Sequence, residues 1–238
     1  MTHTPCPAGH RAALMLRLGE AVLEGTGWQA VARGLAAELG PDVGIAPAGD
    51  RLPPPRRADT VAMSVETPDL GTWTIRVPAD ADPGHLATLP LGEALGLATR
   101  IAEGRLPPRP DLERLLDPLP YAALLLDARG RILFANAAGE DILSSRRLFR
   151  PAAPGRPLSP AERRAGERFD AALAAILLDG APETRWIMAG PEGTHLAVHM
   201  RPAGPPAAPA GAVRAVVTLR AIGATLPSAA ESATTAAG

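Results

Sequence analysis

Apolar side chains recur at helical spacing near the start of the chain. Within residues 11–39 a leucine or valine returns every third or fourth position, which predicts amphipathic helix. The pattern is interrupted at Gly25, Thr26 and Gly27, so two helices are expected. Thr26 is placed to cap the second helix, and Gly40 is placed to end it.

The spacing then changes to the alternation that is typical of β-strands. Residues 60–66 and 71–77 alternate apolar with polar side chains and predict a β-hairpin, and a shorter strand is expected at residues 43–46. Helical spacing returns at residues 86–106 and ends before Pro107. This part of the chain therefore predicts a small module that mixes helices with one hairpin sheet.

The most informative pattern lies near the middle of the chain, where two apolar runs are followed by helix-forming residues. Asp127 and Gly130 are turn residues between the two runs, which predicts a β-hairpin from residues 122–126 and 131–134. Asn136 follows the second run and precedes Ala-Ala-Gly-Glu. Asparagine is a favoured N-cap, so a helix is expected to begin there.

One further helix and three strands are predicted after this point. Residues 160–178 have helical spacing, with Ser159 as N-cap, Pro160 at the first helical position and Glu162 at the capping-box position. Three strands are expected at residues 183–189, 194–202 and 212–222. Two strands, helices and then three strands predict a five-stranded antiparallel sheet.

These elements divide the chain into two small domains of the α+β class. Residues 11–106 form the expected α/β module, residues 118–222 the expected antiparallel-sheet domain, and residues 107–117 the linker, in part a connector helix. Residues 1–10 and 223–238 lack a periodic apolar face and are predicted to be disordered.

Composition narrows the functional classes. The 238 residues are 46% hydrophobic and 21% charged, as in soluble proteins with a core, and the net charge of −1 gives no support for non-specific binding to nucleic acid or membranes. Only 3% are aromatic, so the cores are expected to be built from Ala, Val and Leu. The single cysteine and the absence of a signal sequence or an apolar run of about 18 residues favour a cytoplasmic location.

Two stretches in the second half resemble a known family. LLDPLPYAALLLD (residues 115–127) and GRILFANAAGEDIL (residues 130–143) are similar to the start of the PAS sensor domain in PAS-containing LuxR-type helix-turn-helix transcriptional regulators. The order of elements in residues 11–105 also resembles, more loosely, a GAF domain, although GAF domains normally have five or six strands and three are predicted here. The resemblance implies a GAF-like module followed by a PAS domain that senses a signal or ligand and is linked to transcription regulation.

The same resemblance implies a helix-turn-helix after the last PAS strand, but residues 223–238 show no such pattern, and no direct nucleic-acid binding by this chain is expected. A homodimer is expected, in which the apolar stripe of residues 86–116 pairs with its copy. The alternatives are a ligand-independent dimerisation or scaffold protein and a truncated regulator remnant.

Six residues are candidates for a site or for structural roles. Asn136 either faces a ligand or caps a helix; the cap is favoured, and Asn136→Ala is then expected to cost about 1 kcal/mol. Asp127 is either a signalling contact, as in PAS proteins, or a turn residue, which is favoured. Aromatic side chains at core-facing positions either pack the core, which is favoured, or line a cavity for a small apolar ligand; they are Tyr121, Phe134, Phe169 and Trp186.

Catalytic patterns are not found in the sequence. It contains no GxSxG, HExxH or Walker motif, so an enzyme is not expected. His195 and His199 lie four residues apart in a predicted strand, a separation of about 13 Å at the usual rise, which is too far to share one metal ion. No catalytic residue, metal site or cofactor is therefore predicted.

Overall fold

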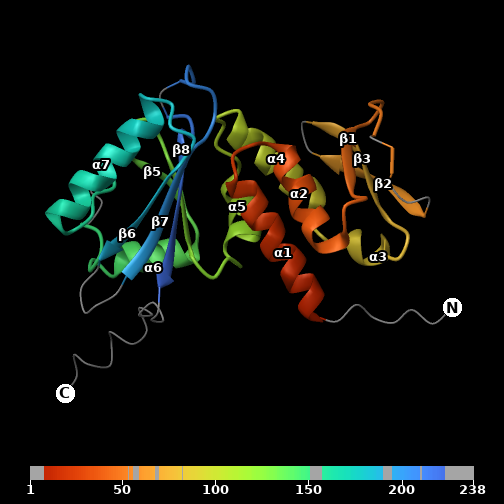
Figure 1. Ribbon diagram of the computed structural model, residues 1–238, viewed down its shortest axis with the longest axis horizontal. Coiled ribbons are helices and arrows are strands. Elements are labelled where there is room, and N and C mark those ends of the chain that lie inside the picture. Colours follow the sequence, from red (N-terminus) through yellow and green to blue (C-terminus); the bar gives the residue numbers. More distant parts are fainter. Residues whose placement is uncertain are drawn as a thin grey trace. The chain divides into compact units, whose positions relative to one another are not determined.

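The computed structural model divides the chain into two compact units, Met1–Ala102 and Glu103–Gly238 (Figure 1). Each unit contains helices and one antiparallel sheet, so the α+β class is confirmed. The segment predicted to be a disordered C-terminal tail lies outside the described residues, as does most of the predicted N-terminal one. The structure describes residues 8–52, 54–55, 59–67, 70–81, 83–150, 157–189, 195–209 and 211–222.

The first unit places helices before and after a three-stranded sheet of order β1-β3-β2. Its elements are α1 (Ala8–Leu23), α2 (Trp28–Leu39), β1 (Gly44–Pro47), β2 (Thr60–Thr67), β3 (Gly71–Pro78), α3 (Pro83–Leu86) and α4 (Leu91–Ala102). The hairpin and the pair of helices are confirmed, although α1 already begins at Ala8, inside the segment predicted to be disordered. Gly27, not Thr26, is the N-cap of α2, and the Thr26 hydroxyl instead accepts a hydrogen bond from Arg33.

The helix predicted at residues 86–106 is shorter and more buried than expected. Helix α4 ends at Ala102, and it packs against α1, α2 and β2. Its buried side chains surround most of the helix, from Leu91 and Leu95 to Leu97 and Ile101. The apolar stripe that was expected to pair with a second copy is therefore largely used in the core of this unit.

The second unit has a five-stranded antiparallel sheet of order β5-β4-β8-β7-β6. Its elements are α5 (Arg109–Leu116), β4 (Ala122–Leu126), β5 (Ile132–Ala135), α6 (Ala137–Ser144), α7 (Arg163–Leu177), β6 (Thr184–Ala189), β7 (His195–Pro202) and β8 (Ala215–Ile222). Every strand predicted in this unit is present. Helix α7 packs over β6, β7 and β8, and α6 packs over β4 and β5 (Figure 1).

Helix α7 begins three residues later than predicted. Its N-cap is Glu162, with no side-chain cap, rather than Ser159. The preceding segment is extended: Pro160 forms an antiparallel bridge with Phe149, and the N–H of Arg150 donates to the Ser159 carbonyl at 2.9 Å. The capping-box pattern was overridden because this segment pairs with residues that precede it in the chain.

The core of the second unit lies between the sheet and helices α6 and α7. Phe169 of α7 makes edge-to-face contacts with Phe149 and Trp186, at ring-centroid distances of 6.5 and 6.2 Å. Aliphatic side chains from the strands surround these rings, among them Leu124 and Val198. Few aromatic residues are available in this chain, and three of them are concentrated in one cluster.

The segment before α5 is tied to the loop between β7 and β8. The N–H of Val213 donates to the Gly104 carbonyl at 2.8 Å. Gly104 and Gly204 both have positive φ, and a Cβ atom on Gly204 would overlap the backbone of Gly104. The first residues of the second unit are therefore anchored to its sheet before α5 begins.

We predict that Gly204→Ala destabilises the protein more than Gly180→Ala does. The two glycines have nearly the same φ, 70° and 68°, so each substitution carries a left-handed strain of about 1–2 kcal/mol. Only at Gly204 would the new methyl group also meet backbone, because nothing lies within 4 Å of the Gly180 position. Urea unfolding should show an additional loss of at least about 1 kcal/mol for Gly204→Ala; equal losses would contradict the close approach to Gly104.

Candidate functional site

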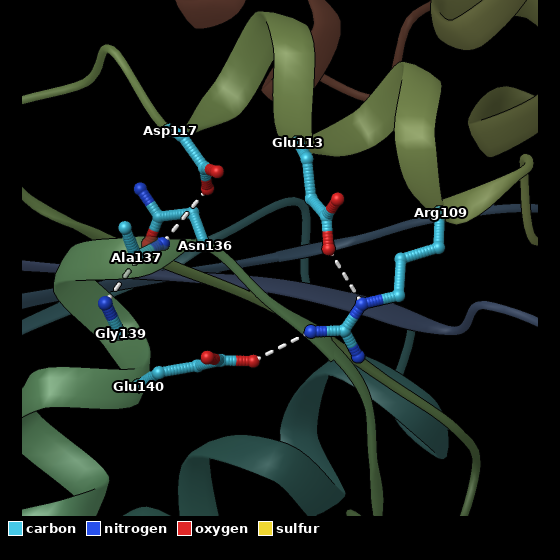
Figure 2. Close-up of polar contacts among 7 residues, drawn as sticks. All are labelled: Arg109, Glu113, Asp117, Asn136, Ala137, Gly139 and Glu140. Atoms are coloured by element: carbon cyan, nitrogen blue, oxygen red, sulfur yellow. Dashed lines mark hydrogen bonds and ion pairs between the residues drawn. The ribbon is translucent and has the colours of Figure 1, made fainter.

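Asn136 is fully buried at the point where α5, β4 and α6 meet (Figure 2). Its Oδ1 accepts hydrogen bonds from the N–H groups of Ala123, at 2.8 Å, and Gly139, at 3.0 Å. Its Nδ2 donates to the carbonyls of Leu116, at 2.8 Å, and Tyr121, at 3.0 Å. The amide thus makes two accepted and two donated bonds, which uses its full ordinary capacity. The capping interpretation is confirmed, and no polar group of this side chain is left to hold a ligand.

Further contacts join α5 to α6 at the same place. Asp117, just after α5, accepts a hydrogen bond from the N–H of Ala137 at 2.8 Å, at the start of α6. Arg109 donates to Glu113 at 2.6 Å and to Glu140 at 2.7 Å (Figure 2). The arginine pairs are exposed, so solvent screens them and they contribute little to stability. The buried amide is therefore the dominant contact of this α5–α6 junction, which we define as Arg109, Asp117, Asn136 and Glu140.

Sequence reasoning found only part of this junction. The position of Asn136 before a helix-forming segment indicated the cap. Asp117 and Arg109 were missed because their partners on α6 are 20 and 31 residues away in the chain. The two bonds from Asn136 back to α5 and the chain after it were missed for the same reason.

We predict that Asn136→Ala costs about 3–5 kcal/mol, several times the loss expected for a simple cap. The substitution leaves two buried N–H groups and two carbonyls without their partner, and each such group costs about 1–3 kcal/mol. Asp117→Ala is the matched control, because it removes an exposed cap from the same helix and should cost about 1 kcal/mol. The free energies of unfolding are measured in urea, and equal losses for the two variants would contradict the central role of Asn136.

Asp127 organises the turn between β4 and β5. Its Oδ1 accepts from the N–H groups of Arg129, at 2.8 Å, and Arg131, at 3.0 Å, and its Oδ2 accepts from the Arg131 guanidinium at 2.6 Å. Burial alone would raise the pKa of this carboxyl, but the hydrogen bonds and charge of Arg131 and the N–H of Arg129 outweigh burial and lower the pKa. Gly130 completes the turn with φ of 71°. The structure thus gives Asp127 the role of a turn residue.

We predict that Asp127→Asn destabilises the protein at neutral pH and that the difference shrinks in acid. The pKa of Asp127 is lower in the folded protein than in the unfolded chain. The carboxylate therefore contributes its full stabilisation above the ordinary aspartate pKa of about 3.9, and this stabilisation is lost as the pH falls through the folded-state pKa. A loss of about 1–3 kcal/mol is expected at neutral pH. Urea unfolding of both proteins at neutral pH and at about pH 3 measures it; a difference that does not shrink would contradict this role.

All four candidate aromatic side chains are buried, as core packing requires, but only two of them belong to the core cluster under α6 and α7. Phe169 and Trp186 belong to the cluster between the sheet and α7. Trp186 is 7% exposed, and its Nε1 has no hydrogen-bond partner among the described residues. A buried indole N–H usually finds an acceptor, so this donor marks a place where the interior lacks a polar partner.

The other two candidates do not join that cluster. The inward-facing residues Leu124 and Ala135 pair with each other, and the next pair along the strands, Leu125 with Phe134, faces the opposite side. Tyr121 likewise precedes the inward-facing Ala122, and its ring lies 4.0 Å from the guanidinium carbon of Arg220. The four aromatic residues therefore do not line one common cavity.

A cavity of about 360 Å³ lies at the N-terminal end of α7, next to β6. Leu148, Ala165 and Met188 provide apolar walls, and Arg147 and Glu162 add one charge of each sign. This volume falls at the lower end of the range for small-molecule pockets. The sequence did not indicate this cavity because three separate segments of the chain supply its walls.

Other kinds of site find little support in the described part of the chain. No group of three or more His, Cys, Asp or Glu side chains there is placed to hold a metal ion. His199 lies 2.8 Å from Glu183, which makes a pair rather than a metal-binding set. Within the same residues, no helix combines the length and apolar character needed to cross a membrane.

Comparison with known proteins assigns this chain to no family. No protein-family profile matches the chain, and no curated protein matches it. Among solved structures it is similar to one described as the sensor region of a sensor histidine kinase, with 16% identity over 92% of this chain and 94% of that chain and a TM-score of 0.38. A TM-score below 0.5 does not establish a common fold, and this likeness carries no functional argument.

Proposed function

We propose that this protein is a PAS-type sensory or regulatory protein. The proposal is supported by the order and arrangement of the strands and helices in the second unit. Two strands, two helices and three strands form one antiparallel sheet with a core under α6 and α7, which is the order that the resemblance of residues 115–143 to PAS domains implies. The first unit is the GAF-like module of this proposal, reduced to three strands. The link to transcription regulation comes from the resemblance to LuxR-type regulators.

The signal in this proposal is a small, mainly apolar molecule. The cavity walls formed by Leu148, Ala165 and Met188 suit such a ligand in size and chemistry.

In this proposal, ligand binding in the cavity changes the position of α5 through α6. Arg147 and Leu148 line the cavity and follow α6 by only a few residues, so a ligand that moves this segment acts on the end of α6. The start of α6 is bonded to α5 through Asn136 and Asp117. A ligand that binds one arrangement of α6 more tightly than another would thereby shift the position of α5.

A second candidate function is ligand-independent dimerisation or scaffolding. The contacts of Phe169 with Phe149 and Trp186 favour it, because these rings fill the centre of the second unit. On this alternative the protein presents fixed surfaces to its partners and its interior stays empty of ligand.

We predict that the purified 238-residue chain retains a small molecule, at up to one per chain, in native mass spectrometry. Ala165→Leu reduces the free volume of the cavity and should lower the retained fraction by at least about fivefold. Ala171→Leu is the matched control, because Ala171 is an exposed residue of the same helix and should leave the fraction unchanged.

Two results would contradict ligand sensing in this cavity. One is a protein without added mass that sediments as a tight dimer, which would favour the scaffold function. The other is a retained molecule that Ala165→Leu and Ala171→Leu release equally.

A further inference from the structure

Strand β2 is a long edge strand of the sheet in the first unit (Figure 1). It pairs with β3 along all of its eight residues, and its other side pairs with no strand in the described part of the chain. It contains no proline or basic residue, and its one charged residue, Glu66, lies near its end. There α4 covers the edge, because a Cβ atom on Gly92 would overlap the Glu66 carbonyl oxygen. Residues 60–64 form the stretch before this cover.

The other edge strands of the described sheets have the features that usually protect an edge from other strands. Strands β1 and β5 have only four residues each, and β1 ends at Pro47. Strand β6 carries Arg185, which pairs with Glu183 at 2.9 Å. Such protection is missing from residues 60–64 of β2.

One hydrogen bond shows which backbone groups of β2 point outward. The N–H of Ala79 donates to the carbonyl of Asp59 at 3.0 Å, one pair before β2 begins. Bonded and non-bonded pairs alternate in an antiparallel ladder, so the odd-numbered residues of β2 bond to β3. The N–H and C=O groups of Thr60, Ala62 and Ser64 therefore point away from β3, and the described residues offer them no partner.

Apolar side chains continue from the core of the first unit to this edge. Val61 and Met63 lie on the same face of the sheet as their buried β3 partners, Val77 and Ile75. Val61 is nevertheless 38% exposed, and Met63 is only half-buried. A strand added beside β2 would cover both side chains, so it would bury apolar surface as well as bond the backbone.

Residues 60–64 are complementary to a second copy of themselves. When two copies run antiparallel about a two-fold axis at Ala62, Thr60 of one faces Ser64 of the other, and Val61 faces Met63. Polar side chains then meet polar ones and apolar side chains meet apolar ones. The same register brings together the residues whose backbone groups point outward, so each of these groups finds a partner.

Charge does not oppose this pairing. The stretch itself is uncharged. On the face that carries Ala62, Arg76 of β3 lies directly opposite, and its guanidinium lies beside Gly44 of β1, on the side away from β2. The backbones of Arg76 and its copy would be three strand spacings apart, roughly 14 Å, which exceeds the screening length of about 8 Å at physiological salt.

We propose that two copies of this chain form a dimer by antiparallel pairing of their β2 strands, with Ala62 at the two-fold axis. The two sheets then continue into one another, and every contact of the interface occurs twice. The paired stretch is short, so the dimer is weak and depends on concentration. This interface shares no residue with the cavity beside Met188 or with the α5–α6 junction, and the proposal does not depend on the PAS-type function.

Sedimentation of the 238-residue chain at concentrations from about 1 to about 300 μM tests this inference. The unmodified protein should shift from monomer to dimer within this range. Ala62→Glu and Ala62→Lys each place two like charges opposite each other at the axis, so each should weaken the dimer by at least about tenfold. An equimolar mixture of the two variants should restore the dimer, because opposite charges then meet at the axis.

Ala37→Glu and Ala37→Lys are the matched controls, because Ala37 is an exposed alanine of α2 in the same unit. Both should dimerise as the unmodified protein does, and thermal unfolding should show that all four variants are folded. Hydrogen exchange gives a second measurement. The amides of Ala62 and Ser64 should exchange more slowly at the high end of the concentration range, because pairing protects N–H groups that face water in the monomer.

Three results would overturn the proposal. One is a chain that stays monomeric throughout the concentration range. Another is a dimer whose dissociation constant is the same in both Ala62 variants as in the unmodified protein, which would assign dimerisation to a different surface. The third is a loss of dimer in both Ala62 variants that mixing does not restore, because residue 62 would then not face its own copy.

Discussion

The second unit depends on one buried amide that has no spare hydrogen-bonding capacity. Asn136 joins the first turn of α6, the start of β4 and the end of α5 through four short bonds. A buried polar group that loses its partners costs far more than one that faces water, so these three segments are held in one arrangement. Because the side chain satisfies backbone groups on each segment, no apolar residue of similar volume can replace it. The hairpin, α6 and the connector helix therefore form a single structural block.

The two faces of the sheet in this unit differ in what covers them. Its inner face, under α6 and α7, holds the ring cluster of Phe149, Phe169 and Trp186 and ends at the cavity near Met188. Its outer face over β6–β8 is open, partly aliphatic and lined by arginine. The anchoring of Gly104 and of Leu116 ties the connector to this sheet at both of its ends.

The sequence predicted the elements well and the contacts between them poorly, for physical reasons. Strand alternation and helical spacing are local signals, so β4 and the later strands lie within a few residues of their expected positions. The start of α7 was misplaced because a bridge from Pro160 to Phe149 is not visible locally. The cap at Asn136 was predictable from its neighbours, whereas its bonds to α5 were not. The four aromatic candidates are all buried, but they are divided between the two faces of the sheet, because one step along a strand moves a side chain to the opposite face.

Hydrogen exchange of individual amides in the unmodified protein tests the central claim most directly. The N–H groups of Ala123 and Gly139 both donate to Asn136 Oδ1, although one belongs to β4 and the other to α6. Because one buried oxygen accepts from both amides, NMR should find both as slow to exchange as the centre of β4, with release only on global unfolding of the unit. Exchange of the Gly139 amide at the rate of a frayed helix end, while β4 stays protected, would contradict the account.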